Sequence, residues 1–216
     1  MPRTALDKES LCDRLCAAAR LLREESGLLG DIDSRFGDGD HGVTMNKIAA
    51  AIEDGSARWR VDTTTSLRNF LASLGDAIMA VGGGSAGPLY GTLVGGLAEP
   101  LSGEEEIDAS TLKAMLRGAY GAMCDITKAR IGDKTMMDAL IPAVEAAECA
   151  PDDVGEILSA AAAAAASGAR ETEKYVSRFG RARSYGEQTI GTPDAGAMST
   201  AILFRGLAGI GDKSVR

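Results

Sequence analysis

The chain has 216 residues, of which 45% are hydrophobic and 4% aromatic, and its formal net charge is −8. This length suits one large domain or two small ones, and the negative charge argues against a general nucleic-acid-binding protein. No apolar run reaches the length of a membrane span. The four cysteines, at positions 12, 16, 124 and 149, complete no metal-binding pattern. We therefore expect a single domain, residues 1–216, in the reducing cytoplasm, with no nucleic acid and no membrane as partner.

Helical periodicity dominates the chain. Apolar stripes predict eight helices, around residues 11–22, 43–52, 67–81, 88–97, 112–123, 136–144, 154–166 and 197–207. Thr65 or Ser66 can cap the third helix, Pro88 can occupy the first turn of the fourth, and Pro142 can kink the sixth. No alternating run of β-branched residues competes with this pattern, so the expected fold class is all-α.

The connections between these helices differ in chemistry. Helices joined by short loops usually pack antiparallel, so every second connection lies at the same end of the domain. The connections at one end hold an acidic segment (33–41), a glycine loop (82–87), a charged segment (128–135) and a segment rich in Arg and Gly (181–196). Those at the other end, 53–64, 101–107 and 150–152, carry no such pattern. We therefore expect a functional site at one rim.

The first of these connections carries Asp33, Asp38 and Asp40, interleaved with glycines. Clustered carboxylates repel unless a cation or a proton neutralises them, and Mg²⁺ or Ca²⁺ with oxygen ligands is the economical explanation. A solvated turn that caps a helix is the alternative. An EF-hand is excluded, because a loop counted from Asp38 has Val43 and Ala49 where Gly and Glu are required. The segment suits a site in which a few carboxylates and a ligand from outside the chain share the cation, as Mg²⁺ is bound together with phosphates.

The glycine loop 82–87 precedes the helix that begins near Pro88. Such a loop offers bare backbone N–H groups to an anion, although a helix stop followed by a turn has the same composition. Neither a Walker A motif nor a dinucleotide-binding GxGxxG motif is present.

His41 is the single histidine. It is either a helix-start residue with satisfied hydrogen bonds or a phosphate or nucleotide contact, and a general base is less favoured because a neighbouring cation lowers its basicity. Arg181 and Arg183 are either solvated or, at this rim, within reach of a phosphate. For Lys134 we favour a structural pair with Asp133 or Asp138 over a catalytic role.

Taken together, these motifs resemble the L subunit of dihydroxyacetone kinases. The resemblance rests on residues 33–42, Gly-Pro-Leu-Tyr-Gly at 87–91, Gly-Asp-Lys-Thr-Met at 132–136 with Asp138, Gly-Arg-Ala-Arg-Ser-Tyr-Gly-Glu at 180–187, Ile-Gly at 190–191 and Asp-Ala-Gly at 194–196. It covers nearly the whole chain, in order. It implies an antiparallel up-and-down barrel of eight helices with a nucleotide at one rim.

The resemblance also implies roles for individual residues. Asp33, Asp38 and Asp40 would hold two Mg²⁺ ions that bridge the phosphates of ATP or ADP, and would be the catalytic residues. The residues that would bind the nucleotide are His41, Gly42, Thr44, Gly84, Ser85, Ala86, Thr127, Met136, Arg181, Asp194, Ala195 and Gly196.

The implied activity is that of a kinase subunit, a phosphotransferase that passes a phosphoryl group from Mg-ATP to dihydroxyacetone on a separate K subunit. Three alternatives stay open: an ADP-retaining subunit rephosphorylated by a phosphocarrier protein, a kinase subunit for a four-carbon ketose, and a non-catalytic regulatory nucleotide-binding subunit. A homodimer also stays open. The chain departs from the family in a glycine loop one residue longer and in Ala195 where a proline is usual. Both changes favour an exchanging nucleotide, and hence ATP as the direct donor.

Overall fold

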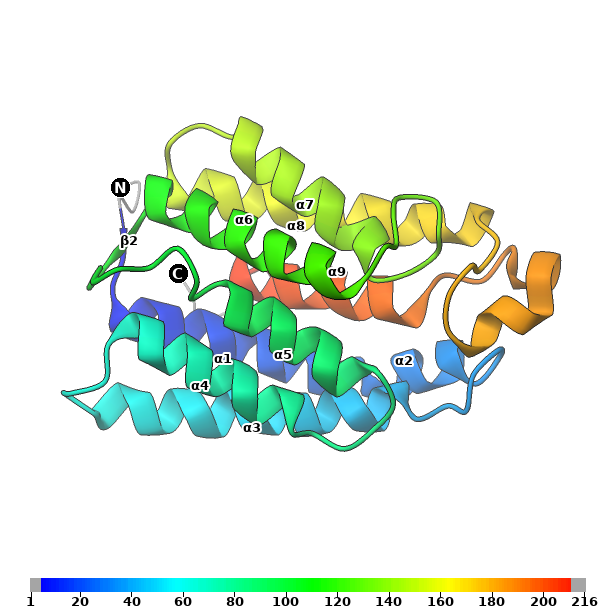
Figure 1. Cartoon of the computed structure of the whole chain (residues 1–216), viewed down its shortest axis with the longest axis horizontal. Helices are drawn as coiled ribbons and strands as arrows, with labels where there is room; N and C mark the ends of the chain where they lie inside the picture. Colours follow the sequence, from blue (N-terminus) through cyan, green and yellow to red (C-terminus); the bar gives the residue numbers. More distant parts are fainter. Residues whose placement is uncertain (1–4, 211–216) are drawn as a thin grey trace.

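The structure, a computed structural model, describes residues 5–210 and is mostly helical (Figure 1). The α-helices are α1 (Lys8–Glu24), α2 (Ser26–Asp33), α3 (His41–Val61), α4 (Leu67–Met79), α5 (Ala86–Gly96), α6 (Ala109–Ile126), α7 (Met137–Cys149), α8 (Val154–Glu171) and α9 (Ala195–Leu207). Two 3₁₀ segments, η1 (Thr172–Lys174) and η2 (Arg181–Thr189), lie between α8 and α9. The strands β1 (Ala5–Leu6) and β2 (Ile107–Asp108) form one short antiparallel pair. Within residues 5–210, no helix is both long and apolar enough to cross a membrane.

Eight of these helices form a closed ring. Each helix of the series α1, α3, α4, α5, α6, α7, α8, α9 packs against the next, and α9 packs back against α1. Consecutive ring helices are antiparallel, and Figure 1 shows them running back and forth along the long axis. The predicted all-α barrel of eight helices is therefore confirmed.

The interior of the ring is filled by aliphatic side chains. Leu22, Ile52, Leu71 and Ile78 are almost completely buried, together with residues from every other ring helix. Burial of one such side chain contributes about 1.5–3 kcal/mol. A cavity of about 60 Å³, lined mainly by leucines, remains near the centre. The core therefore explains the apolar stripes, because each ring helix turns one face inward.

Glycines let some neighbouring helices approach closely. A Cβ atom on Gly91 of α5 would lie 2.7 Å from the carbonyl oxygen of Gly75 in α4. Gly168 of α8 has a similar place, since its Cβ would lie 2.0 Å from the carbonyl oxygen of Asp138. That carbonyl lacks its usual helical donor because Pro142 has no N–H, yet α7 continues through Pro142.

Three features were not predicted from the sequence. Helix α2 has a single buried residue, Leu29, and therefore no apolar stripe. The strand pair is only two residues long on each side, too short for an alternating pattern. Segment η2 is polar, with one buried residue, Thr189. All three lie outside the ring, where burial does not impose a period on the sequence.

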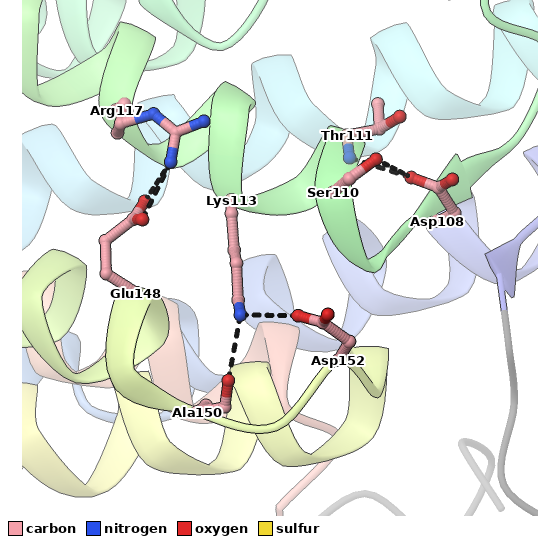
Figure 2. A network of polar contacts seen from close by, with 8 residues as sticks. All are labelled: Asp108, Ser110, Thr111, Lys113, Arg117, Glu148, Ala150 and Asp152. Atoms are coloured by element: carbon pink, nitrogen blue, oxygen red, sulfur yellow. Dashed lines mark hydrogen bonds and ion pairs between the residues drawn. The ribbon is translucent and has the colours of Figure 1, made fainter.

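The end of the barrel formed by the connections 62–66, 97–108 and 150–153, here called the far rim, is held by polar contacts (Figure 2). Lys113 of α6 donates from Nζ to the carbonyl oxygen of Ala150, at 2.8 Å, and to Asp152, at 2.7 Å. Arg117, one turn later, pairs with Glu148. These contacts join α6 to the last turn of α7 and to the connection that follows it, so the far rim has a structural role.

Candidate functional site

The opposite end of the barrel, here called the site rim, is formed by the connections 34–40, 80–85, 127–136 and 172–194 (Figure 1). These are the connections that the sequence places together. Two cavities open there, one of about 410 Å³ lined by polar and apolar groups alike and one of about 360 Å³ lined mainly by apolar side chains. We call them the polar cavity and the apolar cavity. His41, Ser85 and Phe179 line both, so the two are neighbours.

Three carboxylates meet in the polar cavity and are called here the carboxylate cluster: Asp33, Asp38 and Asp40. One oxygen of each lies within 4.8 Å of the others, and the described residues contain no other such group of Asp, Glu, His or Cys. Gly39 has φ 74°, which lets the backbone turn back between Asp38 and Asp40. Cys12 and Cys16, one helical turn apart, are free thiols and join no such group.

The carboxylate cluster fits a hard cation. Asp40 stands at the N-cap of α3, where an aspartate usually accepts a backbone N–H, yet its side chain makes no capping hydrogen bond. Its carboxylate is therefore available to a ligand. Three converging carboxylates with room for outside oxygens match the preference of Mg²⁺ for oxygen donors.

Arg181 lies over the carboxylate cluster. Its guanidinium forms an ion pair with Asp38, and nearby the rings of Phe36 and Tyr185 pack with centroids 5.2 Å apart. The Arg181 side chain is 64% exposed, so this ion pair contributes little to stability. Arg181 is thus a cationic side chain that can turn to an incoming anion at small cost.

Helix starts differ between the two rims. At the far rim, α1, α4, α6 and α8 each have a side-chain cap, from Asp7, Ser66, Asp108 and Asp153 respectively. At the site rim, α3, α5 and α7 have none, and only α9 is capped. The first N–H groups of α7 are already bonded, since that of Met137 donates to Thr135 Oγ1 at 3.2 Å and that of Asp138 to the carbonyl oxygen of Thr135 at 3.0 Å. The uncapped starts of α3 and α5 leave N–H groups and the positive end of the helix dipole to a ligand. The site rim therefore offers donors to an anion although the chain is acidic.

The glycine loop shapes one of these uncapped starts. Gly83 and Gly84 have φ values of 143° and 54°, in a region that other residues rarely adopt. Ser85 follows at the N-cap of α5, where its side chain makes no capping hydrogen bond, and Gly84, Ser85 and Ala86 all line the polar cavity. The start of α5 thus lies beside the carboxylate cluster, as expected for a site that holds a metal together with phosphates.

The apolar cavity suits a flat ring. Its lining includes Leu89, Tyr90, Met123, Met136, Met137 and Phe179, with Thr127 at its edge. Sites for heterocyclic ligands are concave and mainly apolar, with few polar groups. Thr127 and Met136, which the resemblance assigns to nucleotide binding, therefore line a cavity that can accept a flat ring.

His41 is held at the boundary of the two cavities. Its Nε2 lies 2.8 Å from Ser199 Oγ, which in turn lies 2.7 Å from the hydroxyl of Tyr90. Burial lowers the pKa of His41, while Asp33 and a hydrogen bond to the Ala195 backbone oppose that effect. Burial raises the pKa of Tyr90 to about 12. Burial therefore favours the neutral imidazole, and the bond to Ser199 fixes its orientation, which suits an oriented contact better than a free general base.

Asp194 begins α9 and lines both cavities. Its carboxylate accepts a hydrogen bond from the N–H of Ala197 at 2.7 Å, and its own N–H donates to Thr172 Oγ1 at 2.9 Å. Burial raises the pKa of Asp194 from 3.8 to about 7. Ala195 and Gly196 follow it and line the polar cavity.

Two predicted residues lie outside both cavity linings. Gly42 packs against α2, since a Cβ there would lie 2.0 Å from the carbonyl oxygen of Ser26. Thr44 is buried, and its Oγ1 would lie 2.2 Å from a Cβ on Gly83. Both residues shape the neighbouring loops in this structure, and their direct contact with a nucleotide stays a prediction.

Lys134 has different partners from those favoured in the sequence analysis. No ion pair joins it to Asp133 or Asp138; its ammonium instead donates to four backbone carbonyls. The carboxylate of Asp138 accepts from the N–H groups of Gly132, at 2.6 Å, and Thr135, at 2.7 Å. The structural interpretation of Lys134 holds, but the prediction of a carboxylate partner was wrong.

Sequence reasoning missed several residues of the site. Phe36 and Phe179 line the polar cavity, and Ser199 connects His41 to Tyr90. Tyr90 lies in the Gly-Pro-Leu-Tyr-Gly motif, so that motif was the available signal for it. The two phenylalanines lie in irregular segments, where no periodicity marks a side chain as inward-facing.

Comparison with known proteins agrees with this geometry. A family model described as the DAK2 domain matches residues 35–209. The D-erythrulose kinase of Mycolicibacterium smegmatis is 37% identical over 195 residues, which are 89% of this chain and 33% of that protein. The ADP-binding subunit DhaL of the PEP-dependent dihydroxyacetone kinase of Escherichia coli is 30% identical over 208 residues, 94% of this chain and 97% of that subunit.

A solved structure shares the fold. The dihydroxyacetone kinase from C. freundii, in complex with AMP-PNP and Mg²⁺, superposes with a TM-score of 0.68 and 25% identity over 96% of this chain and 34% of that one. The chain thus spans about a third of that kinase and of the erythrulose kinase, and nearly all of the E. coli subunit. With the family model matching most of the chain, this protein belongs to the DAK2 domain family, alongside the ADP-binding DhaL subunits of dihydroxyacetone kinases.

Proposed function

We propose that this chain is the nucleotide-binding subunit of a ketose kinase, which transfers a phosphoryl group from Mg-ATP to a ketose held on a separate K-type subunit. One observation carries the proposal. The carboxylate cluster opens into the same cavity as the uncapped start of α5 and Arg181, and an apolar cavity adjoins it. The groups that would hold a metal, the phosphates and a ring are therefore neighbours at this rim.

Each part has a distinct task in this reaction. Phosphoryl transfer needs mainly positioning and neutralisation of charge. Asp33, Asp38 and Asp40 would hold Mg²⁺, two ions by the family resemblance, which would neutralise the phosphate oxygens. The N–H groups at the start of α5 would bind phosphate oxygens, and Arg181 would exchange its contact with Asp38 for one with a phosphate. The apolar cavity would hold the adenine ring and fix the direction of the nucleotide.

The acceptor would come from a partner. In the resembling family, a histidine of the K subunit binds the sugar covalently. The single histidine of this chain, His41, is instead engaged by Ser199 and the Ala195 backbone. The E. coli protein matched along almost its whole length is likewise named a subunit. These points support a two-subunit enzyme.

A four-carbon ketose is the second candidate acceptor. The relatives named erythrulose kinases reach 37% identity, whereas the DhaL subunits lie at 30–31%. The residues that recognise the sugar would lie on the partner. The choice is therefore tested by pairing this chain with K-type subunits of either kind and comparing rates on dihydroxyacetone and erythrulose.

The decisive experiment is calorimetry of ADP binding in Mg²⁺ and in EDTA. We expect binding in Mg²⁺ and a loss of at least about tenfold in affinity in EDTA, because the bare carboxylate cluster would face phosphates of the same charge. Equal affinity in both would contradict the proposal. If binding depends on Mg²⁺ but no K-type partner restores transfer, the chain is a regulatory nucleotide-binding subunit.

A further inference from the structure

Residues 172–192 leave the end of α8, pass over the two cavities and return to α9; we call them the covering segment. They carry Phe179 and Gly180, which line both cavities, and Arg181, which pairs with Asp38. The middle of the covering segment, near residues 178–188, is solvent-exposed, since Phe179 is 39% and Tyr185 44% exposed. This middle part is contacted by neighbouring connections, since the N–H of Arg178 donates to the carbonyl oxygen of Asp133 at 3.1 Å and the ring of Tyr185 packs on Phe36.

The outgoing part of the segment, near residues 172–177, and the returning part, near residues 189–192, form its base. Hydrogen bonds join these two parts. The N–H of Gly191 donates to the carbonyl oxygen of Glu173 at 2.7 Å. The N–H of Ser177 donates to Thr189 Oγ1 at 3.0 Å. At the end of the segment, the N–H of Asp194 donates to Thr172 Oγ1.

Lys134, from another connection, reaches into this base. Its side chain is buried, and Nζ donates to the carbonyl oxygens of Thr172 (2.7 Å), Tyr175 (3.1 Å), Thr189 (2.7 Å) and Thr192 (2.6 Å). Two of these carbonyls belong to the outgoing part of the covering segment and two to the returning part. One ammonium therefore joins both parts.

This arrangement is unfavourable by itself. Burial lowers the pKa of Lys134, an effect opposed by Asp194, Glu173 and Asp138, so the charged form is costly to hold there. Among the described residues, Lys134 is also the one non-glycine with positive φ, at 62°. Strained backbone of this kind collects at functional sites, where the surrounding structure maintains it.

From this geometry we infer that Lys134 is a positioning residue of the nucleotide site. Its hydrogen bonds hold the two parts of the base together, and the covering segment thereby keeps Arg181 and Phe179 over the cavities. The inference rests on the proposed function. Lys134 acts through the segment, because its donors are directed to carbonyls and none remains for a phosphate.

The test compares Lys134→Met with Lys174→Met, which removes an exposed lysine of the covering segment whose ammonium pairs with Glu171. Trypsin is added well below the unfolding transition, and cleavage after Arg178, Arg181 and Arg183 is followed. We expect Lys134→Met to be cleaved at least about tenfold faster there, since local opening exposes the backbone, and Lys174→Met to behave like the unaltered chain. Unchanged cleavage in Lys134→Met would overturn the inference.

A double-mutant cycle separates positioning from general destabilisation. Mg-ADP affinity is measured for Lys134→Met, Arg181→Ala and the double variant. If Lys134 acts through Arg181, its substitution lowers affinity severalfold alone but adds little once Arg181 is gone. Fully additive losses would contradict this role.

A second variant and the nucleotide-independent proteolysis assay keep the role of Lys134 testable. If Lys134→Met does not fold, Lys134→Gln, which keeps part of the length and one amide donor group, replaces it in both assays. If the unaltered chain binds no Mg-ADP, the proposed function fails, whereas the proteolysis result still decides whether Lys134 holds the covering segment.

Discussion

Asp40 stands where an aspartate usually caps a helix, and its carboxylate instead faces Asp33 and Asp38. We expect Asp40→Asn to lower Mg-ADP affinity by at least about a hundredfold and to abolish turnover with a K-type partner, because one charged metal ligand is lost. The helical circular dichroism should not change, since the loop lies outside the core. Calorimetry and a coupled kinase assay measure both effects.

The matched control is Asp31→Asn. Asp31 is exposed on α2, close to the carboxylate cluster but not part of it, so this variant removes the same charge without removing a ligand. Its Mg-ADP affinity should stay within about twofold of the unaltered chain, because an exposed charge is largely screened. A large loss in both variants would mean that overall charge, and not coordination, decides the affinity.

Asp194 should make stability depend on pH. Its pKa of about 7 lies above the ordinary 3.8, so the folded chain retains a proton that the unfolded chain releases. This contribution is complete below about pH 4 and is lost as pH rises through 7. Asp194→Asn keeps a capping side chain but does not titrate. Its free energy of unfolding, relative to the unaltered chain, should rise between pH 4 and 8 by on the order of 3 kcal/mol.

Asp108 provides a control of opposite sign. Hydrogen bonds from the N–H and hydroxyl of Thr111 lead the causes that lower its pKa, so its stabilising contribution is present above the ordinary pKa and is lost as pH falls. Asp108→Asn should therefore lose stability, relative to the unaltered chain, as pH rises from 3 to 6. Denaturant titrations at several pH values compare the two. The same slope for both variants would contradict the assignment of Asp194.

Residues of the site differ in how well the sequence predicts them. The carboxylate cluster and the glycine loop are contiguous motifs whose residue types state their chemistry. Lys134 carries no such signal, because its four partners are backbone carbonyls 38 to 58 residues away. Any residue type can supply a carbonyl, so no pattern of side chains reveals these contacts.

At the scale of elements, the ring helices were predictable and the additions to the ring were not. Each ring helix turns an apolar face to the core and so carries a period in its sequence. Helix α2 buries only Leu29, and η2 only Thr189. The sequence therefore predicts the barrel, whereas the segments that cover its site had to be seen in three dimensions.

The packing of α4 on α5 gives a prediction at this scale. Gly91→Ala would place a Cβ 2.7 Å from backbone atoms of Gly75 and Met79, so we expect it to destabilise the fold by about 1–3 kcal/mol. Gly95, one turn later, has nothing within 4 Å of such a Cβ. Gly95→Ala should stabilise by about 0.5–1 kcal/mol, because alanine loses less backbone entropy in a helix than glycine does. Thermal unfolding of both variants measures the difference, and equal effects would contradict the close approach.

The start of α9 gives a prediction about the phosphoryl donor. It begins with Ala195 and Gly196, which leave the backbone more conformational freedom than a proline would. Closing this segment over a nucleotide therefore costs more conformational entropy. We therefore expect nucleotide to exchange, with ATP as the direct donor. Analysis of the purified protein by chromatography should find less than one ADP per chain after dialysis. Stoichiometric ADP that resists dialysis, with no activity on added ATP, would instead point to a phosphocarrier protein.

For the whole molecule, we expect the chain alone to phosphorylate neither dihydroxyacetone nor erythrulose at an appreciable rate. The proposed ketose site lies on a partner, and positioning of the two reactants supplies much of the rate of such reactions. Addition of a K-type subunit should restore transfer in a coupled assay. Substantial activity of the chain by itself would refute the two-subunit proposal.

Closure of the ring has a consequence for the order of the helices along the chain. Helix α9 ends beside the second turn of α1, where Arg14 Nη1 donates to the carbonyl oxygen of Leu207 at 2.6 Å, at the end of the barrel away from the site. A short peptide linking α9 to α1 would close the chain into a ring of eight helices, so the barrel has no obligatory first helix. A circular permutant opened at 151–152 should fold and still bind Mg-ADP, whereas one opened at 82–84 should fold and lose the nucleotide.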